Sequence, residues 1–139
     1  MYHQLILQRI LDTINLLTNN TEDKEFEKFL RQKASIMNSW LIQMTFSNGN
    51  IPLVNDASPG MAPTTSLLSD YASLLNVKSN TSPLSSSGYR KVQVGDLELL
   101  INLGTVSPNY QPGHSHADTF NTIVHYKQQP IIVDMGTST

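Results

Sequence analysis

The sequence predicts an α+β fold in which helices come first and antiparallel strands follow. Apolar residues in the first half recur every three or four positions, the period of one helix face. In the second half they alternate with polar residues, which is the period of a strand. Between the halves lies SNTSPLSSSG, a polar segment with little to bury. We therefore predict a helical segment at residues 1–78, a linker at 79–88 and an antiparallel β-domain at 89–139.

Three helices are predicted in the first half. One covers residues 2–18, and a second runs from an N-cap at Thr21 to about residue 45. Thr65 or Ser66 is the expected cap of a short third helix. The apolar positions of these helices are Leu7, Ile10, Leu11, Ile14 and Leu17, then Phe26, Phe29, Leu30, Met37, Trp40, Leu41 and Met44, then Leu68, Tyr71, Ala72 and Leu75. We expect all of them, including Trp40 and the Phe and Met residues, to face the core.

Four strands are predicted in the second half. The first two form a hairpin across Gly95-Asp96, a two-residue turn signal, with Val92, Val94, Leu97, Leu99 and Ile101 in alternation. The last two cover Phe120 to Val124 and Ile131 to Val133, joined by the polar turn Lys127-Gln128-Gln129. His125 follows the third strand in alternation, so we expect it to face solvent.

The motif GHSHAD gives this half its chemistry. His114 and His116 are two residues apart, so on extended backbone both rings point to one side. Imidazole and carboxylate are common zinc ligands, and Asp118 and Asp134 are the candidate carboxylates. A strand that returns beside its neighbour would bring Asp134 level with His116. The alternative is a solvated loop with two ordinary surface histidines.

Composition excludes several classes of function. The formal net charge of −2 offers no electrostatic basis for binding nucleic acid. The chain has no cysteine, which excludes disulfides and thiolate metal sites. No apolar run approaches the roughly twenty residues of a membrane span. The N-terminus lacks the features of a signal peptide, and because the chain starts inside a helix and stops after a strand we expect it to be a fragment.

Three segments together resemble a known family. GHSHAD, followed after a strand by IVDMGT, resembles the GHxHAD and VDxGT motifs of heparinase II/III-like polysaccharide lyases. The Tyr2-His3 start of the first helix and the segment IPLVND at residues 51–56 are similar to features of the same family. The resemblance implies the last helices of an (α/α) toroid followed by the first strands of an antiparallel β-sandwich, with a cleft between them.

The resemblance also implies roles for single residues. Tyr2 matches the catalytic tyrosine, and His114 matches the histidine that neutralises the substrate carboxylate. His116 and Asp134 match two ligands of a zinc ion with a structural role, whose third histidine would follow Thr139. His3 and Asn55 would line the substrate cleft. Asp118 would either orient a histidine or bind the metal.

The activity implied is β-elimination on a uronic-acid polysaccharide such as a glycosaminoglycan or alginate. The expected partner is an acidic polysaccharide, not nucleic acid or membrane. Whether the chain forms a homo-oligomer is left open. A periplasmic or secreted location would follow from the family. The alternative is a non-catalytic carbohydrate-binding domain or a metal-stabilised β-domain that carries the same loop.

Overall fold

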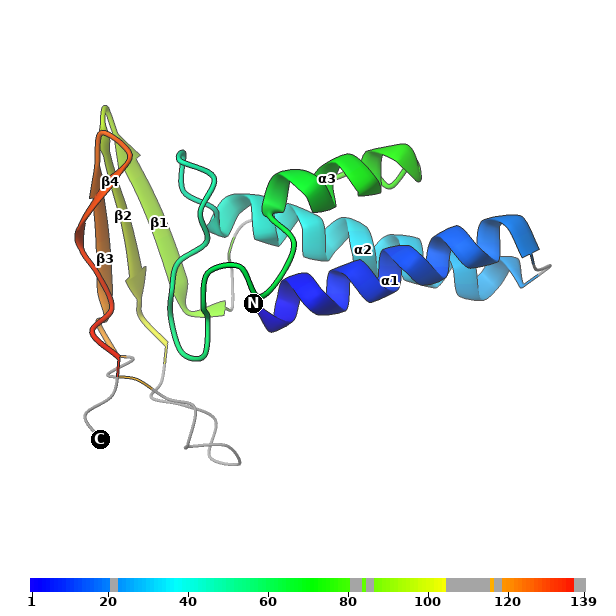
Figure 1. The fold of residues 1–139 in the computed structure, drawn as a ribbon, viewed down its shortest axis with the longest axis horizontal. Coiled ribbons are helices and arrows are strands. Elements are labelled where there is room, and N and C mark those ends of the chain that lie inside the picture. The colour runs from blue at the N-terminus through cyan, green and yellow to red at the C-terminus, as the bar shows by residue number, and fades with distance from the viewer. Residues whose placement is uncertain (21–22, 81–83, 85–86, 105–115, 117–118, 137–139) are drawn as a thin grey trace. The chain divides into compact units, whose positions relative to one another are not determined.

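A computed structural model describes residues 1–20, 23–80, 84, 87–104, 116 and 119–136 (Figure 1). It contains helices and one antiparallel sheet, so the α+β prediction is confirmed. The elements are α1 (Tyr2–Asn20), α2 (Lys24–Met44), α3 (Thr65–Leu74), β1 (Tyr89–Val94), β2 (Leu97–Asn102), β3 (Thr122–Tyr126) and β4 (Gln129–Ile132). The chain forms two compact units, residues 1–42 with 60–83 (unit 1) and residues 43–59 with 84–139 (unit 2). None of the described helices has the length and apolar character that a membrane span requires.

In unit 1, α1 runs antiparallel to α2 and parallel to α3 (Figure 1). At the start of α1, His3 Nε2 lies 2.9 Å from the carbonyl oxygen of Met37, and Gln4 donates to the carbonyl oxygen of Pro63 just before α3. Farther along α1, the hydroxyl of Tyr71 lies 3.3 Å from Asp12. Leu7, Leu11 and Ile14 of α1 are fully buried. The predicted apolar face of the first helix therefore forms the centre of this unit.

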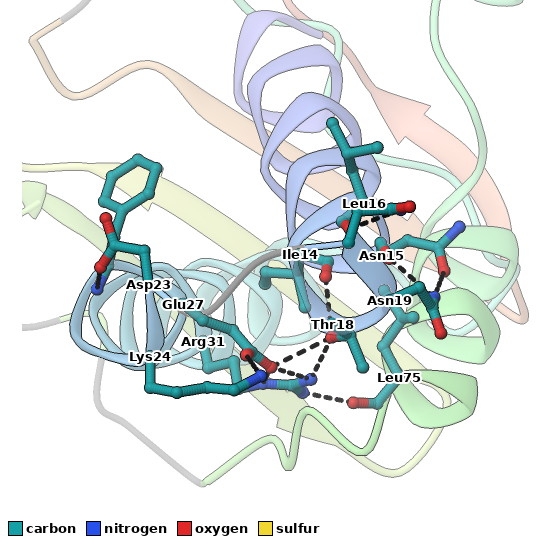
Figure 2. Close-up of polar contacts among 12 residues, drawn as sticks. Ile14, Asn15, Leu16, Thr18, Asn19, Asp23, Lys24, Glu27, Arg31 and Leu75 are labelled. Carbon is teal, nitrogen blue, oxygen red and sulfur yellow. Dashed lines mark hydrogen bonds and ion pairs between the residues drawn. The ribbon is translucent and has the colours of Figure 1, made fainter.

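A polar cluster around Arg31 ties the far ends of the three helices together (Figure 2). The Arg31 guanidinium donates to Glu27 at 2.8 Å, to Thr18 of α1 at 2.9 Å and to the carbonyl oxygen of Leu75 after α3. Lys24 contacts the second oxygen of Glu27 at 3.1 Å. The hydrogen bonds from Arg31, and then those from Lys24 and Thr18, lower the pKa of Glu27 to about 2. Because this pKa is so low, Glu27 is ionised at neutral pH and keeps its hydrogen bonds to Arg31, Lys24 and Thr18.

The N-caps of the second and third helices differ from those predicted. Asp23, rather than Thr21, accepts a hydrogen bond at 3.1 Å from the backbone N–H of the third residue of α2. Thr64 does the same for α3, in place of the predicted Thr65 or Ser66. In both helices the cap lies directly before the first helical residue, where a side-chain oxygen reaches an unpaired N–H. Thr21 lies outside the described residues.

The buried stripe of α2 also differs from the predicted one. It follows Glu27, Leu30, Ala34, Asn38 and Leu41, at spacings of three and four residues. Phe26 and Phe29 each precede a stripe position by one residue, about 100° around the helix, and are 45% and 50% exposed. Trp40 is half-buried against the ring of His3, at a centroid distance of 4.7 Å. The prediction that the aromatic residues of this helix are core was therefore wrong for both phenylalanines.

In unit 2, four strands form an antiparallel sheet in the order β1-β2-β3-β4 (Figure 1). Gly95-Asp96 joins β1 to β2, with Val94 paired with Leu97 as the turn signal predicts. The second hairpin is shifted from its predicted place, because its turn consists of Lys127 and Gln128, with φ of 48° and 65°. Two successive residues with positive φ are typical of a type I′ turn. As a result β3 extends to residue 126 and β4 begins at 129.

One face of this sheet is covered by the segment that follows α2. Phe46 of that segment stacks on His125 of β3, with ring centroids 3.8 Å apart and an interplanar angle of 18°. His125 is only 6% exposed, so the prediction that it faces solvent was wrong. On the other face, Val92 and Val94 are 50% and 69% exposed. The covered face therefore carries Glu98 and His125 together with the buried Leu100 and Ile123, whereas Val92 and Val94, predicted apolar positions, face away from the covering segment.

The covered face includes a buried ion pair. Glu98 of β2, 2% exposed, accepts hydrogen bonds from the backbone N–H and the hydroxyl of Ser47, and Lys91 Nζ lies 3.3 Å away. Burial raises the pKa of Glu98, but the hydrogen bonds from Ser47 and Lys91 outweigh burial and hold this pKa below its ordinary value. Lys91 Nζ also lies 5.1 Å from the ring centre of Phe46. These contacts fix residues 45–47 on the sheet.

Candidate functional site

The loop between β2 and β3 carries GHSHAD, and the structure describes the two ends of this loop. At its base, Phe120 N–H donates to the carbonyl oxygen of Asn102, and Asn102 N–H donates to the carbonyl oxygen of Asn121, at 2.8 and 2.9 Å. Gly88 supports this base from the start of β1. Its φ is +80°, and a Cβ there would lie 2.8 Å from the Cα of Gly104, so only glycine fits. The backbone on both sides of the loop is therefore fixed by the sheet.

The described residues near this loop converge on the carboxylate of Asp134. His116 Nδ1 lies 2.7 Å from Oδ1, and the backbone N–H of Gly136 donates to the same oxygen at 2.7 Å. The side-chain amide of Asn121 donates to Oδ2. The side chain of Asp134 is 3% exposed and that of His116 is 17% exposed. A nearly buried carboxylate is thus hydrogen-bonded at both oxygens and faces an imidazole that reaches solvent.

The donor types at this pair fit part of a zinc site. Zinc bonds of about 2.0–2.1 Å to nitrogen and oxygen place two tetrahedral ligands about 3.3 Å apart. His116 Nδ1 and Asp134 Oδ1 are already 2.7 Å apart, so a separation of roughly half an ångström more would admit the ion between them. Within the part of the chain that the structure describes, no group of three His, Asp or Glu side chains could hold a metal. The pair can supply two ligands.

Two of the residues predicted for this loop, His114 and Asp118, lie outside the described residues. Asn121, in contrast, was not predicted. Its position immediately before β3 was the available signal, because a side chain at the end of one strand can reach residues at the end of its antiparallel neighbour. The GHSHAD motif predicts histidines and carboxylates as site residues, whereas Asn121, whose amide contacts Asp134, lies three residues beyond the motif.

The predicted residues at the N-terminus belong to unit 1. Tyr2 is the first residue of α1 and is 57% exposed. His3 has its Nε2 atom against the carbonyl oxygen of Met37 and its ring against Trp40. Burial lowers the pKa of His3, although the hydrogen bond to Met37 acts in the opposite direction. His3 is therefore neutral near pH 7 and joins α1 to α2.

Asn55, the remaining predicted residue, belongs to unit 2. It is half-buried and has a φ of 52°, a left-handed conformation that asparagine adopts more readily than most residues. A turn role accounts for this residue type at this position. Among the residues predicted from the sequence, the structure thus brings together His116 and Asp134. It gives His3 and Asn55 local structural contacts or conformations of their own.

Comparison with known proteins gives one match. The family model described as heparinase II/III-like, C-terminal, matches residues 76–139, which include the GHSHAD loop, Asn121 and Asp134. Neither the curated proteins nor the solved structures gave a match to the chain. The matched segment covers β1 to β4 and both residues of the 2.7 Å pair. Residues 76–139 are therefore similar to the C-terminal domain of the heparinase II/III-like family.

Proposed function

We propose that this chain is part of a polysaccharide lyase that cleaves a uronic-acid-containing polysaccharide by β-elimination. The observation that carries the proposal is the family match over residues 76–139. The convergence of His116 and Asp134 supports it, because these two residues lie within the matched segment. The substrate class we propose is an acidic polysaccharide, either a glycosaminoglycan or alginate, met in the periplasm or outside the cell.

The chemistry explains why a tyrosine and a histidine are needed. In β-elimination a base removes the proton on the carbon next to the uronate carboxylate, and the C4–O bond then breaks to leave a C4–C5 double bond. The carbanion is accessible only if a donor neutralises the carboxylate. In this proposal Tyr2 takes the proton and returns one to the leaving oxygen, while His114 hydrogen-bonds the carboxylate.

His116 and Asp134 have a different part in this proposal. They hold a structural zinc ion, which when bound would cross-link the GHSHAD loop to the segment after β4 and so fix the position of His114. His3 and Asn55 are proposed to line the substrate site. For His3 this leaves Nδ1 to meet a sugar hydroxyl, since Nε2 faces the carbonyl oxygen of Met37.

Substitution of Tyr2 tests the proposed elimination. Tyr2→Phe removes the hydroxyl that carries the proton and little apolar area, so turnover should fall by about 10²–10⁴ while folding is unchanged. The assay follows the ultraviolet absorbance of the unsaturated product on alginate, heparan sulfate and hyaluronan.

Tyr71→Phe is the matched control, because it removes a tyrosine hydroxyl of the same unit that contacts Asp12. It should leave turnover nearly unchanged. If Tyr2→Phe keeps turnover within about tenfold of the unsubstituted protein, equivalent to about 1.4 kcal/mol of barrier, Tyr2 is not the proton carrier.

A second candidate function is a non-catalytic, metal-stabilised or carbohydrate-binding β-domain. The observation that favours it is the hydrogen bonding of both Asp134 oxygens by protein groups, which would hold the loop in the absence of any substrate. It predicts that zinc raises the melting temperature and that none of the three polysaccharides gives an unsaturated product. Product formation on any of them rejects it.

A further inference from the structure

The orientation of the Asp134 carboxylate is set from two directions. Gly136 N–H donates to Oδ1 at 2.7 Å, and the Asn121 amide donates to Oδ2. Gly136 is two residues away along the same segment, so its N–H moves with Asp134. Asn121 is thirteen residues away and comes from the start of β3. Of these two donors, Asn121 is therefore the one that ties the carboxylate to the sheet.

The backbone of Asn121 is itself held in place. Its carbonyl oxygen accepts the N–H of Asn102 at 2.9 Å, which continues the ladder between β2 and β3 beyond the pair Ile101–Thr122. A carboxylate turns easily about its last side-chain bond, because this torsion has broad, two-fold energy wells. A donor fixed to the sheet restricts this rotation. With Oδ2 engaged by Asn121, Oδ1 is the oxygen that faces His116.

The direction of these hydrogen bonds also matters. A side-chain amide and a backbone N–H can only donate to a carboxylate, so Oδ1 still presents an acceptor to His116. An acceptor at 2.7 Å from Nδ1 favours the imidazole tautomer that carries its proton there. A metal ion in place of that proton would be held by the same oxygen and nitrogen.

We infer that Asn121 is a positioning residue that holds the Asp134 carboxylate so that its Oδ1 atom and His116 Nδ1 face each other. The inference rests on the proposed function only in taking the pair to be a zinc-holding pair. It is consistent with the general pattern in which the hydrogen-bond partners of metal ligands set the orientation and affinity of the site.

The test uses Asn121→Ala, which removes the donor, and Asn121→Asp, which keeps the shape but places an acceptor opposite Oδ2. Thr122→Val is the matched control, because the Thr122 hydroxyl donates at 2.9 Å to Phe120 in the same segment and not to Asp134. The first readout is the nitrogen NMR spectrum of the His116 ring in metal-free protein, assigned with His116→Gln. The second is the affinity for Zn²⁺ alone, measured by competition with a chelator.

We expect the unsubstituted protein and Thr122→Val to show one tautomer with the proton on Nδ1. Both Asn121 variants should show a mixture or the other tautomer, and their zinc affinity should fall by about 10–100-fold. The zinc affinity of Thr122→Val should change by about twofold at most. An unchanged tautomer in both Asn121 variants would overturn the inference. So would unchanged zinc affinity in both, if the unsubstituted protein binds zinc.

The two readouts separate this inference from the proposed function. If the unsubstituted protein binds no zinc but both Asn121 variants lose the single tautomer, Asn121 positions the pair and the proposed zinc role fails. If Tyr2→Phe keeps full turnover while the Asn121 variants lose tautomer and zinc affinity, the elimination mechanism fails and the positioning role stands. A variant that loses the far-ultraviolet circular dichroism of the fold is replaced by the other Asn121 variant.

Discussion

Unit 2 contains two carboxylates in nearly identical burial, and they have different basic partners. The side chains of Glu98 and Asp134 are each 3% exposed, and their basic partners, Lys91 and His116, are each 17% exposed. Each carboxylate also has two further donors. For Glu98 these are the N–H and hydroxyl of Ser47, and for Asp134 they are the amide of Asn121 and the N–H of Gly136.

The difference lies in the basic partner and in what the carboxylate joins. Lysine is charged at neutral pH and has no lone pair to offer, so Glu98 and Lys91 form a closed pair that fixes residues 45–47 to the sheet. An imidazole can give up its proton and then bind a metal. Burial and hydrogen bonding therefore do not distinguish Glu98 from Asp134. The chemistry of the basic partner does.

Loss of the Glu98 charge should have the largest effect on stability. Glu98→Gln keeps the shape but leaves the partly buried charge of Lys91 without a counter-ion, so the free energy of unfolding should fall by about 3 kcal/mol. Urea denaturation at pH 7.5, with a chelator present, measures it.

The double variant Glu98→Gln with Lys91→Met is the control for this prediction. Replacing both partners removes the unpaired charge, so it should recover at least half of the loss. A loss below about 1 kcal/mol in the single variant, the range of an exposed ion pair, would show that Glu98 is not part of a buried pair.

Asp134→Asn should cost less in metal-free protein. Its basic partner is an imidazole, not an ammonium group, so the loss should be about 1–2 kcal/mol from disturbed hydrogen bonds. In the presence of zinc the difference from the unsubstituted protein should grow, because the ion stabilises a fold that binds it. Urea denaturation with and without zinc measures both quantities. A metal-free loss as large as that of Glu98→Gln would remove the distinction between the two sites.

Much of the fold could be predicted from the sequence, because local periodicity determines it. The apolar face of the first helix and the Gly95-Asp96 hairpin are set by residues close together in the chain. The proximity of His116 and Asp134 also followed from local reasoning, since a returning strand brings its end back to the loop that precedes its neighbour.

The predictions that were wrong concern which face of the sheet or of a helix is covered by another segment. Alternation in β1 to β3 shows that the two faces of the sheet differ, but the contact between Phe46 and His125 joins residues 79 positions apart. No local pattern contains that contact. The same applies to Phe26 and Phe29, whose apolar character suggested core positions on α2, and to the amide of Asn121, whose role appears only when Asp134 is placed beside it.

The smallest predicted effect concerns His125, the one imidazole in the Glu98 cluster, which among the described residues consists of Glu98, Ser47, Lys91, Phe46 and His125. Burial lowers the pKa of His125 from its ordinary value of 6.5; Glu98 opposes this shift and Lys91 adds to it. Because the folded pKa is below the unfolded one, the unfolded state takes up the proton first, and stability falls as the pH drops from about 6.5 through the folded pKa. The loss that comes from Glu98 begins lower, below its ordinary pKa of 4.5, because the pKa of Glu98 is also lowered in the folded state.

His125→Phe separates these two contributions. It keeps the stack on Phe46 and removes Nδ1, which has no hydrogen-bond partner among the described residues. Denaturation between pH 7.5 and 4 should show a fall below pH 6.5 in the unsubstituted protein, of which His125 contributes at most about 1.4 kcal/mol per pH unit. The variant should show a smaller fall, because His3, whose pKa is also lowered, still contributes to it, and it should keep the loss below pH 4.5. If both proteins lose stability equally between pH 6.5 and 5, His125 does not titrate in this cluster, and Glu98 and Lys91 form the closed pair without it.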